Sequence, residues 1–127
     1  MYKEILIIII VVVLVIGLDV ISNNYLKESV TELSNELNML KVPILEEKKE
    51  KSQEQMKRVK EKWMERYKVL AYYIEHDELE KVETELVRLA ADIDMEEYKQ
   101  CINELNTSIF ILEHIQQKEK LDIISIF

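Results

Sequence analysis

Hydrophobic residues follow two different patterns along this chain. Near the N-terminus, 14 consecutive non-polar residues run from Ile5 to Leu18, and Val20 and Ile21 continue the run beyond Asp19. In the rest of the chain, apolar side chains recur every three or four residues, which is typical of amphipathic helices. The pattern therefore predicts an all-α protein, in which an N-terminal transmembrane helix precedes an antiparallel bundle of about four helices.

The N-terminal apolar segment is long enough to cross a bilayer. As a helix, Ile5 to Ile21 spans about 25 Å, at the short end of the membrane-spanning range. Asp19 lies near one end of the segment, where its carboxylate can reach water. We expect residues 1–22 to form an uncleaved signal anchor and residues 23–127 to form the bundle domain. The anchor positions in contact with lipid are Ile5, Leu6, Ile10, Leu14 and Leu18.

Two other interpretations of this segment stay open. The apolar run also has the length of a cleaved signal peptide, although no Ala-x-Ala sequence follows it. A buried segment of a water-soluble core is the second alternative. The orientation rests on Lys3 and on the small number of residues before the span, which together favour a cytoplasmic N-terminus. We therefore expect a single-pass protein whose C-terminal domain lies outside the cytoplasm.

A heptad-like seam follows the anchor, in which apolar residues advance by 4, 3, 4 and 3 positions. No strong helix breaker stands near Ser22-Asn23-Asn24, so the anchor either continues into this helix as one rod or kinks there. Pro43 is the firm breaker, and it disfavours a helical Val42. The seam residues are Leu26, Val30, Leu33, Leu37 and Leu40.

Three more helices are predicted after Pro43. They run from Ile44 to about Ile74, from the turn at Asp77 onward, and from Asp94 onward. Asp77 with Glu80, and Asp94 with Glu97, resemble capping boxes. The expected apolar faces are Met56, Val59, Trp63, Tyr67, Leu70 and Ile74; Leu79, Val82, Leu86, Leu89, Ala90 and Ile93; and Tyr98, Ile102, Leu105, Ile109, Leu112 and Ile115.

Charge excludes one class of function and is unevenly placed. The chain of 127 residues has 25 acidic and 17 basic side chains, a net charge of −8. This balance argues against nucleic-acid binding, which requires a basic face. Residues 76–127 carry 13 acidic and 5 basic side chains, whereas residues 23–75 are nearly neutral. The acidic half is explained by a solvated outer face, and a docking surface for a basic partner is the alternative.

No arrangement of residues indicates catalysis, a cofactor or a metal ion. The two histidines, His76 and His114, are far apart and stand in no metal-binding motif. Cys101, the one cysteine, excludes a disulfide framework, and we expect a buried, inert thiol; a cross-link between two exported copies is the alternative. The acidic residues around Asp92 and Glu97 are explained by adjacent helix ends. We expect a protein that is not an enzyme.

Four residues are candidates for a partner surface. Tyr72 and Tyr73 are adjacent in one helix and cannot both face inward. The segment from Leu121 to the end is too apolar to extend free into water, so it folds back, docks on a partner or lies on the membrane surface. The candidate surface is therefore Tyr72, Tyr73, Ile124 and Phe127. Ser52, within a densely charged stretch, is expected to be exposed.

The chain resembles an uncharacterised family of short bacterial envelope proteins, classified as a domain of unknown function. The resemblance rests on the stretches Ile5–Leu18, Trp63–Tyr73 and Leu79–Leu112. It implies a single-anchor helical protein without assigned catalytic residues. It also implies an accessory role beside a multi-span membrane protein of the YetF-like kind.

These observations predict a membrane-anchored, extracytoplasmic helical interaction module that assists a membrane-protein partner. The expected contacts are the lipid bilayer and that partner. An extracytoplasmic four-helix ligand sensor is one alternative, because bundles bind small molecules between helices. A short coiled-coil envelope scaffold, which would form a homodimer through the juxtamembrane seam, is another. The seam covers only two heptads before Pro43, which is short for a sustained coiled coil.

Overall fold

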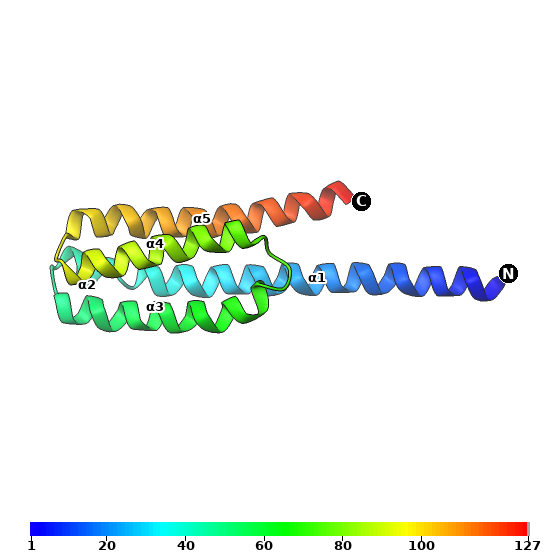
Figure 1. The fold of residues 1–127 in the computed structure, drawn as a ribbon, viewed down its shortest axis with the longest axis horizontal. Helices are drawn as coiled ribbons and strands as arrows, with labels where there is room; N and C mark the ends of the chain where they lie inside the picture. Colours follow the sequence, from blue (N-terminus) through cyan, green and yellow to red (C-terminus); the bar gives the residue numbers. More distant parts are fainter. Residues whose placement is uncertain (127) are drawn as a thin grey trace.

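Four long helices and one short helix make up the described part of the chain (Figure 1). The computed structural model describes residues 1–126, with side chains described for residues 1–121. No strand occurs within this part of the chain, so the all-α prediction is confirmed. The helices are α1 Tyr2–Asn38, α2 Lys41–Leu45, α3 Lys49–Leu70, α4 His76–Asp94 and α5 Tyr98–Ile126.

The anchor segment and the first bundle helix are one continuous rod, α1, of 37 residues. There is no break at Ser22-Asn23-Asn24, so the first of the two predicted alternatives holds. The buried residues of α1 begin at Leu26, and the N-terminal half projects beyond the other helices (Figure 1). The apolar segment therefore joins the bundle without a linker, and the boundary is the point on α1 at which the other helices begin to pack against it.

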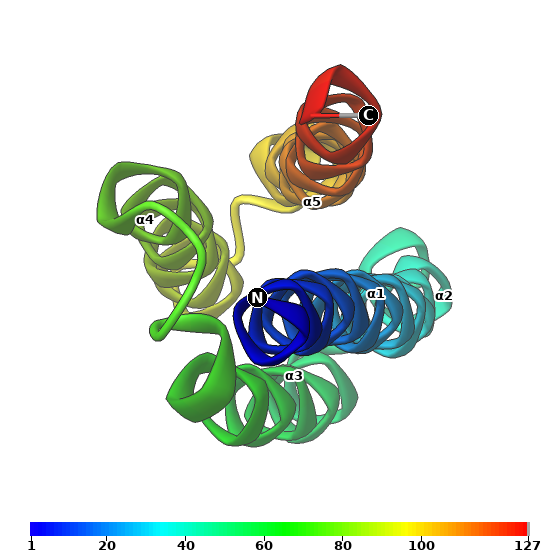
Figure 2. The same cartoon turned by 90° about the vertical axis from the view of Figure 1, so that its right-hand side faces the viewer.

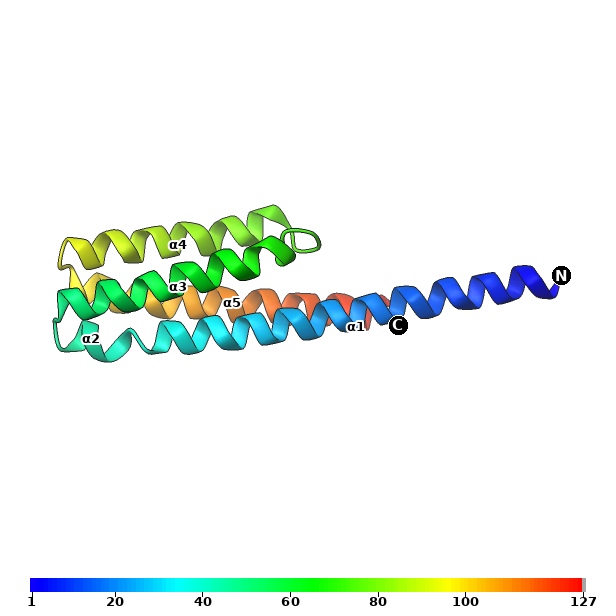
Figure 3. The same cartoon turned by 90° about the horizontal axis from the view of Figure 1, so that it is seen from below.

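The long helices form a four-membered ring in which sequence neighbours run antiparallel. The C-terminal half of α1 packs against α3 and α5, and α4 packs against the same two helices. Figure 2 shows the four helices around a shared interior, and Figure 3 shows the bundle occupying only part of the length of α1. The arrangement confirms the predicted antiparallel bundle.

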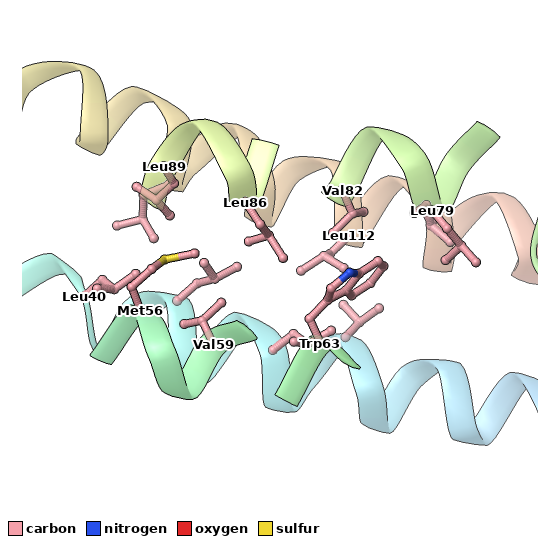
Figure 4. Packing of buried hydrophobic residues seen from close by; sticks show 14 of the residues in the cluster. Leu40, Met56, Val59, Trp63, Leu79, Val82, Leu86, Leu89 and Leu112 are labelled. Atoms are coloured by element: carbon pink, nitrogen blue, oxygen red, sulfur yellow. The ribbon is translucent and has the colours of Figure 1, made fainter. Parts of the chain in front are cut away.

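The core consists largely of the predicted apolar stripes, although Tyr67, Ala90 and several positions on α5 are only partly buried. The whole juxtamembrane seam from Leu26 to Leu40 is buried, and side chains from α3, α4 and α5 meet it in the interior (Figure 4). On α5 the fully buried positions include Cys101 and Ser108, whereas the predicted Ile102 and Ile109 are half-buried. Small side chains allow α5 to approach its neighbours closely, and a search for large apolar residues does not detect them.

Pro43 does not separate two helices as predicted. It lies within α2, and Val42 before it is helical as well. Because α2 begins at Lys41, the proline nitrogen falls in the first turn, where a backbone N–H has no partner within the helix. Consequently the next long helix, α3, begins at Lys49 and ends at Leu70, shorter than the predicted span from Ile44 to Ile74.

The predicted capping boxes are also wrong. The N-cap of α4 is Glu75, and no side chain caps that helix. Asp77 lies in the first turn, where its charge still favours the helix dipole. Asp94 is the last residue of α4, and its carboxylate accepts a hydrogen bond of 2.8 Å from the Gln53 side chain of α3. Long-range contacts thus replace the local ones that the spacing suggested.

Two helix ends adopt the Schellman geometry with glutamate in the left-handed position. Glu47 after α2 has φ 54°, and Glu96 after α4 has φ 59°. In each case two backbone N–H groups bond back to the last turn: Lys48 to Pro43 at 2.9 Å and Glu97 to Asp92 at 2.9 Å are the outer pairs. Both turns lie at the end of the bundle that is far from the N-terminus (Figure 1), which we call the distal end.

Candidate functional site

The N-terminal half of α1 exposes apolar side chains on every side. Leu14 is 60 % exposed and Leu18 is 63 % exposed, and Ile5, Leu6 and Ile10 are similarly exposed. The helix is long and apolar enough to span a membrane, with a mean hydropathy of 3.3 over its most apolar stretch, none of which is buried. Its all-round apolarity differs from the bundle helices, which are apolar on one face only.

The bundle meets α1 directly at the end of this apolar segment. The hydroxyl of Tyr73, in the turn between α3 and α4, donates a hydrogen bond of 3.1 Å to the Ser22 carbonyl. Burial raises the pKa of Tyr73 to about 12. Beside this contact lies a small cavity of about 120 Å³, to which Asp19 of α1 and Glu119 of α5 both contribute. The turn and α5 therefore lie at the level of residues 19–23.

Three of the four residues predicted as a partner surface, Tyr72, Tyr73 and Ile124, belong to segments at this same end of the bundle. Tyr72 is 90 % exposed, whereas Tyr73 is half-buried against the core. Ile124 belongs to the last turns of α5, and its side chain lies outside the described part of the chain. Phe127 lies outside the described residues. The structure separates the two tyrosines, one facing outward and one inward, as their adjacency required.

A charged cluster that sequence reasoning missed joins α1 to α3. The Arg66 guanidinium of α3 pairs with the Glu32 carboxylate of α1 and lies 5.0 Å from the centre of the Tyr25 ring. Lys62 approaches the same carboxylate at 3.5 Å. The hydrogen bond from Arg66 holds the pKa of Glu32 below its usual value, against the effect of burial. Arg66 continues the α3 stripe that contains Trp63 and Leu70, so its spacing was the available signal.

An acidic pair lies between α4 and α5. Burial, followed by the nearby Asp92 carboxylate, raises the pKa of Glu104 to about 7. Glu85 adds to this effect and Arg88 opposes it. Among the described residues, no group of three or more histidine, cysteine or acidic side chains is arranged to hold a metal ion.

Cys101 and the histidines do not converge on a reactive site. Cys101 is fully buried, and burial with the nearby acidic groups raises the pKa of its thiol to about 11. This agrees with the expected inert thiol, because the thiolate is the reactive form. His76 lies 4.0 Å from Glu80 on the surface of α4, and the His114 ring stacks on Phe110 at 6.3 Å on α5.

Two observations bear on the alternative functions. The juxtamembrane seam packs inside its own bundle, so its residues do not supply a free seam for a homodimer. A hollow of about 470 Å³ over α4 and α5 is an open, charged groove. Ser52, expected to be exposed, is fully buried, and its hydroxyl bonds to the Lys48 carbonyl at 2.7 Å.

Comparison with known proteins identifies a family for this bundle. No curated protein and no solved structure matches the chain. A family model matches residues 20–126, which begin at the end of the apolar segment and include all four bundle helices. The match covers most of the chain. On this evidence the protein belongs to the family described as a domain of unknown function, DUF4363.

Proposed function

We propose that the protein is a membrane-anchored helical accessory module without catalytic activity, which assists a membrane-protein partner. The observation that carries the proposal is the exposed, all-round apolar half of α1, which continues without a break into a bundle helix. Such a surface is unfavourable in water and is matched by a lipid bilayer. The bundle is held at the membrane surface, where it meets proteins of the same membrane.

The domain is proposed to lie outside the cytoplasm. A single introduced cysteine tests this orientation, with Met95→Cys at the distal end because Met95 is 71 % exposed. Cys101 can stay in place, because its buried thiol reacts slowly, and the parent chain gives the background. Labelling of intact cells by a membrane-impermeant maleimide supports the orientation. Labelling that requires lysis places the bundle in the cytoplasm and overturns it.

The partner is proposed to be a multi-span membrane protein, of the YetF-like kind that the family resemblance implied. Purification of the tagged full chain in mild detergent should recover one membrane protein in fixed proportion. A matched chain carrying an unrelated membrane span in place of residues 1–22 separates two modes of recognition. A partner retained by this chain recognises the bundle, and a partner lost from it recognises the anchor. The absence of any such protein from the parent purification contradicts the accessory role.

A further inference from the structure

The membrane-proximal end of the bundle consists of the α3–α4 turn, residues 71–75, and the last turns of α5. The turn is fixed to α1 by the bond from Tyr73 to Ser22, one residue after the apolar segment ends at Ile21. Beyond that level, α5 continues in the direction of the N-terminal end of α1 and diverges from α1 as it does so (Figure 1). Leu121 to Ile126 add about 9 Å of helix in that direction.

Charged residues stop at a shared level on the two antiparallel helices. On α1, no charged residue lies between Asp19 and Glu4. On α5, charges end at Asp122, and the sequence continues Ile-Ile-Ser-Ile-Phe. Asp19 and Glu119 contribute to one cavity, which places the boundary on α1 beside the helical turn of α5 that precedes Asp122. Two helices of opposite direction that change from charged to apolar at one level define a plane, as the surface of a bilayer would.

Exposed apolar groups gather at this plane. Tyr72 is 90 % exposed at the turn, and Leu121 is 63 % exposed on α5 where the apolar end begins. Tyrosine is enriched at membrane interfaces because its ring is apolar and its hydroxyl is polar. Among the residues of α5 up to Leu121, the last buried position is Ile115.

Resting on the proposed anchor, we propose that the protein contacts the bilayer a second time, through Tyr72 and the last turns of α5. The occupant of this surface is lipid: the ring of Tyr72 lies among the headgroups, and the end of α5 enters the interfacial layer beside α1. The contact fixes the bundle upright on the membrane. It also accounts for the apolar residues of the candidate surface without a protein partner.

This contact is apolar rather than electrostatic. The neighbouring side chains include Glu75 and Asp77, which repel anionic headgroups, and Lys118 is engaged by Glu75 at 3.5 Å and Glu78 at 3.5 Å. We therefore expect insertion in neutral vesicles that is at least as deep as in anionic vesicles. A requirement for anionic lipid would contradict this assignment.

Site-directed spin labels test the second contact in the full chain. Nitroxides at Ile10→Cys, Tyr72→Cys, Met95→Cys and Ile126→Cys are compared in phosphatidylcholine vesicles, by their accessibility to oxygen and to a water-soluble nickel complex. We expect Ile10→Cys to lie deepest, Ile126→Cys to lie at interfacial depth, and Met95→Cys to stay in water. Nickel accessibility at Ile126→Cys should be about threefold lower than at Met95→Cys, with oxygen accessibility kept.

The outcomes separate the second contact from the anchor. A deep Ile10→Cys label with an Ile126→Cys label as open to nickel as Met95→Cys overturns the second contact and leaves the anchor standing. An Ile126→Cys label shielded from both reagents indicates burial in protein and also overturns it. A water-exposed Ile10→Cys label contradicts the proposed anchor itself.

A substitution on α5 provides an independent check. The double variant Ile123→Asp, Ile126→Asp places charge at the end of α5 and should raise nickel accessibility at Tyr72→Cys about twofold. The matched control is Phe110→Asp, on the same helix and 67 % exposed at the side of the bundle. It should leave the Tyr72→Cys label unchanged. An equal response to both variants contradicts the proposal.

Discussion

The raised pKa of Glu104 gives a residue-scale prediction about pH. The carboxyl has a reference pKa of 4.5 and a native pKa of about 7, so the native state holds the proton more tightly. Stability is therefore full at low pH and falls as the pH rises through the interval between these two values. Glu104→Gln should raise stability by about 1 kcal/mol at pH 8, after allowance for partial solvent screening.

Thermal unfolding of the full chain in mild detergent, at pH 5 and pH 8, measures this effect. Through Glu104, the parent should gain melting temperature at pH 5 relative to pH 8. Glu104→Gln should narrow the difference in melting temperature between the two pH values. Glu113→Gln, an exposed change on the same helix, is the control. An unchanged pH dependence in Glu104→Gln would show that Glu104 is ionised normally.

The two glutamates with positive φ give a second residue-scale prediction. A side chain in the left-handed region costs about 1 kcal/mol, which glycine avoids. Glu47→Gly and Glu96→Gly should each raise the free energy of unfolding by roughly 0.5–1 kcal/mol, and the melting temperature should rise with it. Glu50→Gly, inside α3, should lower it by a similar amount. A loss of stability in Glu96→Gly would mean that the ion pair of Glu96 with Lys49, at 3.8 Å, contributes more than the relief of backbone strain.

At the scale of elements, the pairing of α1 with α3 depends on the charged cluster around Arg66. Arg66→Leu removes the partner of Glu32 and leaves a half-buried carboxylate behind, so we expect a loss of about 2 kcal/mol. Lys62→Leu removes a more exposed lysine and should change stability by less than about 1 kcal/mol. Melting temperatures of each single variant, of Glu32→Gln and of the corresponding double variants measure the coupling of Arg66 and of Lys62 to Glu32. Equal effects of the two substitutions would contradict the central position of Arg66.

The anchor is the second element for which a prediction is sharp. Two aspartates at its centre, Ile10→Asp with Leu14→Asp, should disfavour insertion by about 5–7 kcal/mol and move the chain out of the carbonate-resistant membrane fraction. The matched control is Val42→Asp with Leu45→Asp on α2, where the side chains are 60 % and 65 % exposed. These changes keep the distal end in water and should leave fractionation unchanged. Membrane release by the control pair would place α2 against lipid.

Element boundaries were harder to predict than elements. The seam from Leu26 to Leu40 and the α4 stripe repeat large apolar residues. A repeated pattern identifies a helix even where a single position departs from it. Pro43, Asp77 and Asp94 are single residues whose local preferences were outweighed by packing of the helices around them. The clusters at Arg66 and Glu104 each form between two helices. The spacing of residues along one helix does not show which other helix will lie beside it.

At the scale of the whole molecule, an upright bundle has a measurable height. The helix from Ser22 to Asn38 rises about 24 Å, so a bundle that stands upright on the membrane, as proposed, holds its distal end roughly that far above the surface. Energy transfer to acceptor-labelled lipids should be strong from a donor at Tyr72→Cys and weak from one at Met95→Cys. Equal transfer from the two positions would mean that the bundle lies flat.

The sequence predicted the overall architecture of the molecule, but it did not predict which segments lie beside the apolar part of α1. Apolar periodicity with short connections implied an antiparallel bundle, and the apolar run implied a helix long and apolar enough to cross a bilayer. The placement of the α3–α4 turn and α5 beside residues 19–23 needed the fold, because Tyr73 and Glu119, which line one cavity, are brought together only by packing.

The unbroken α1 has an angular consequence. Each residue turns a helix by about 100°, so the side of the anchor that faces a neighbour in the membrane is set by the orientation of the bundle outside it. An insertion of two residues after Gly17 would rotate one against the other by about 200°, whereas an insertion of seven would restore the phase within about 20°. A partner that holds both parts at once should be lost with the first insertion and regained with the second.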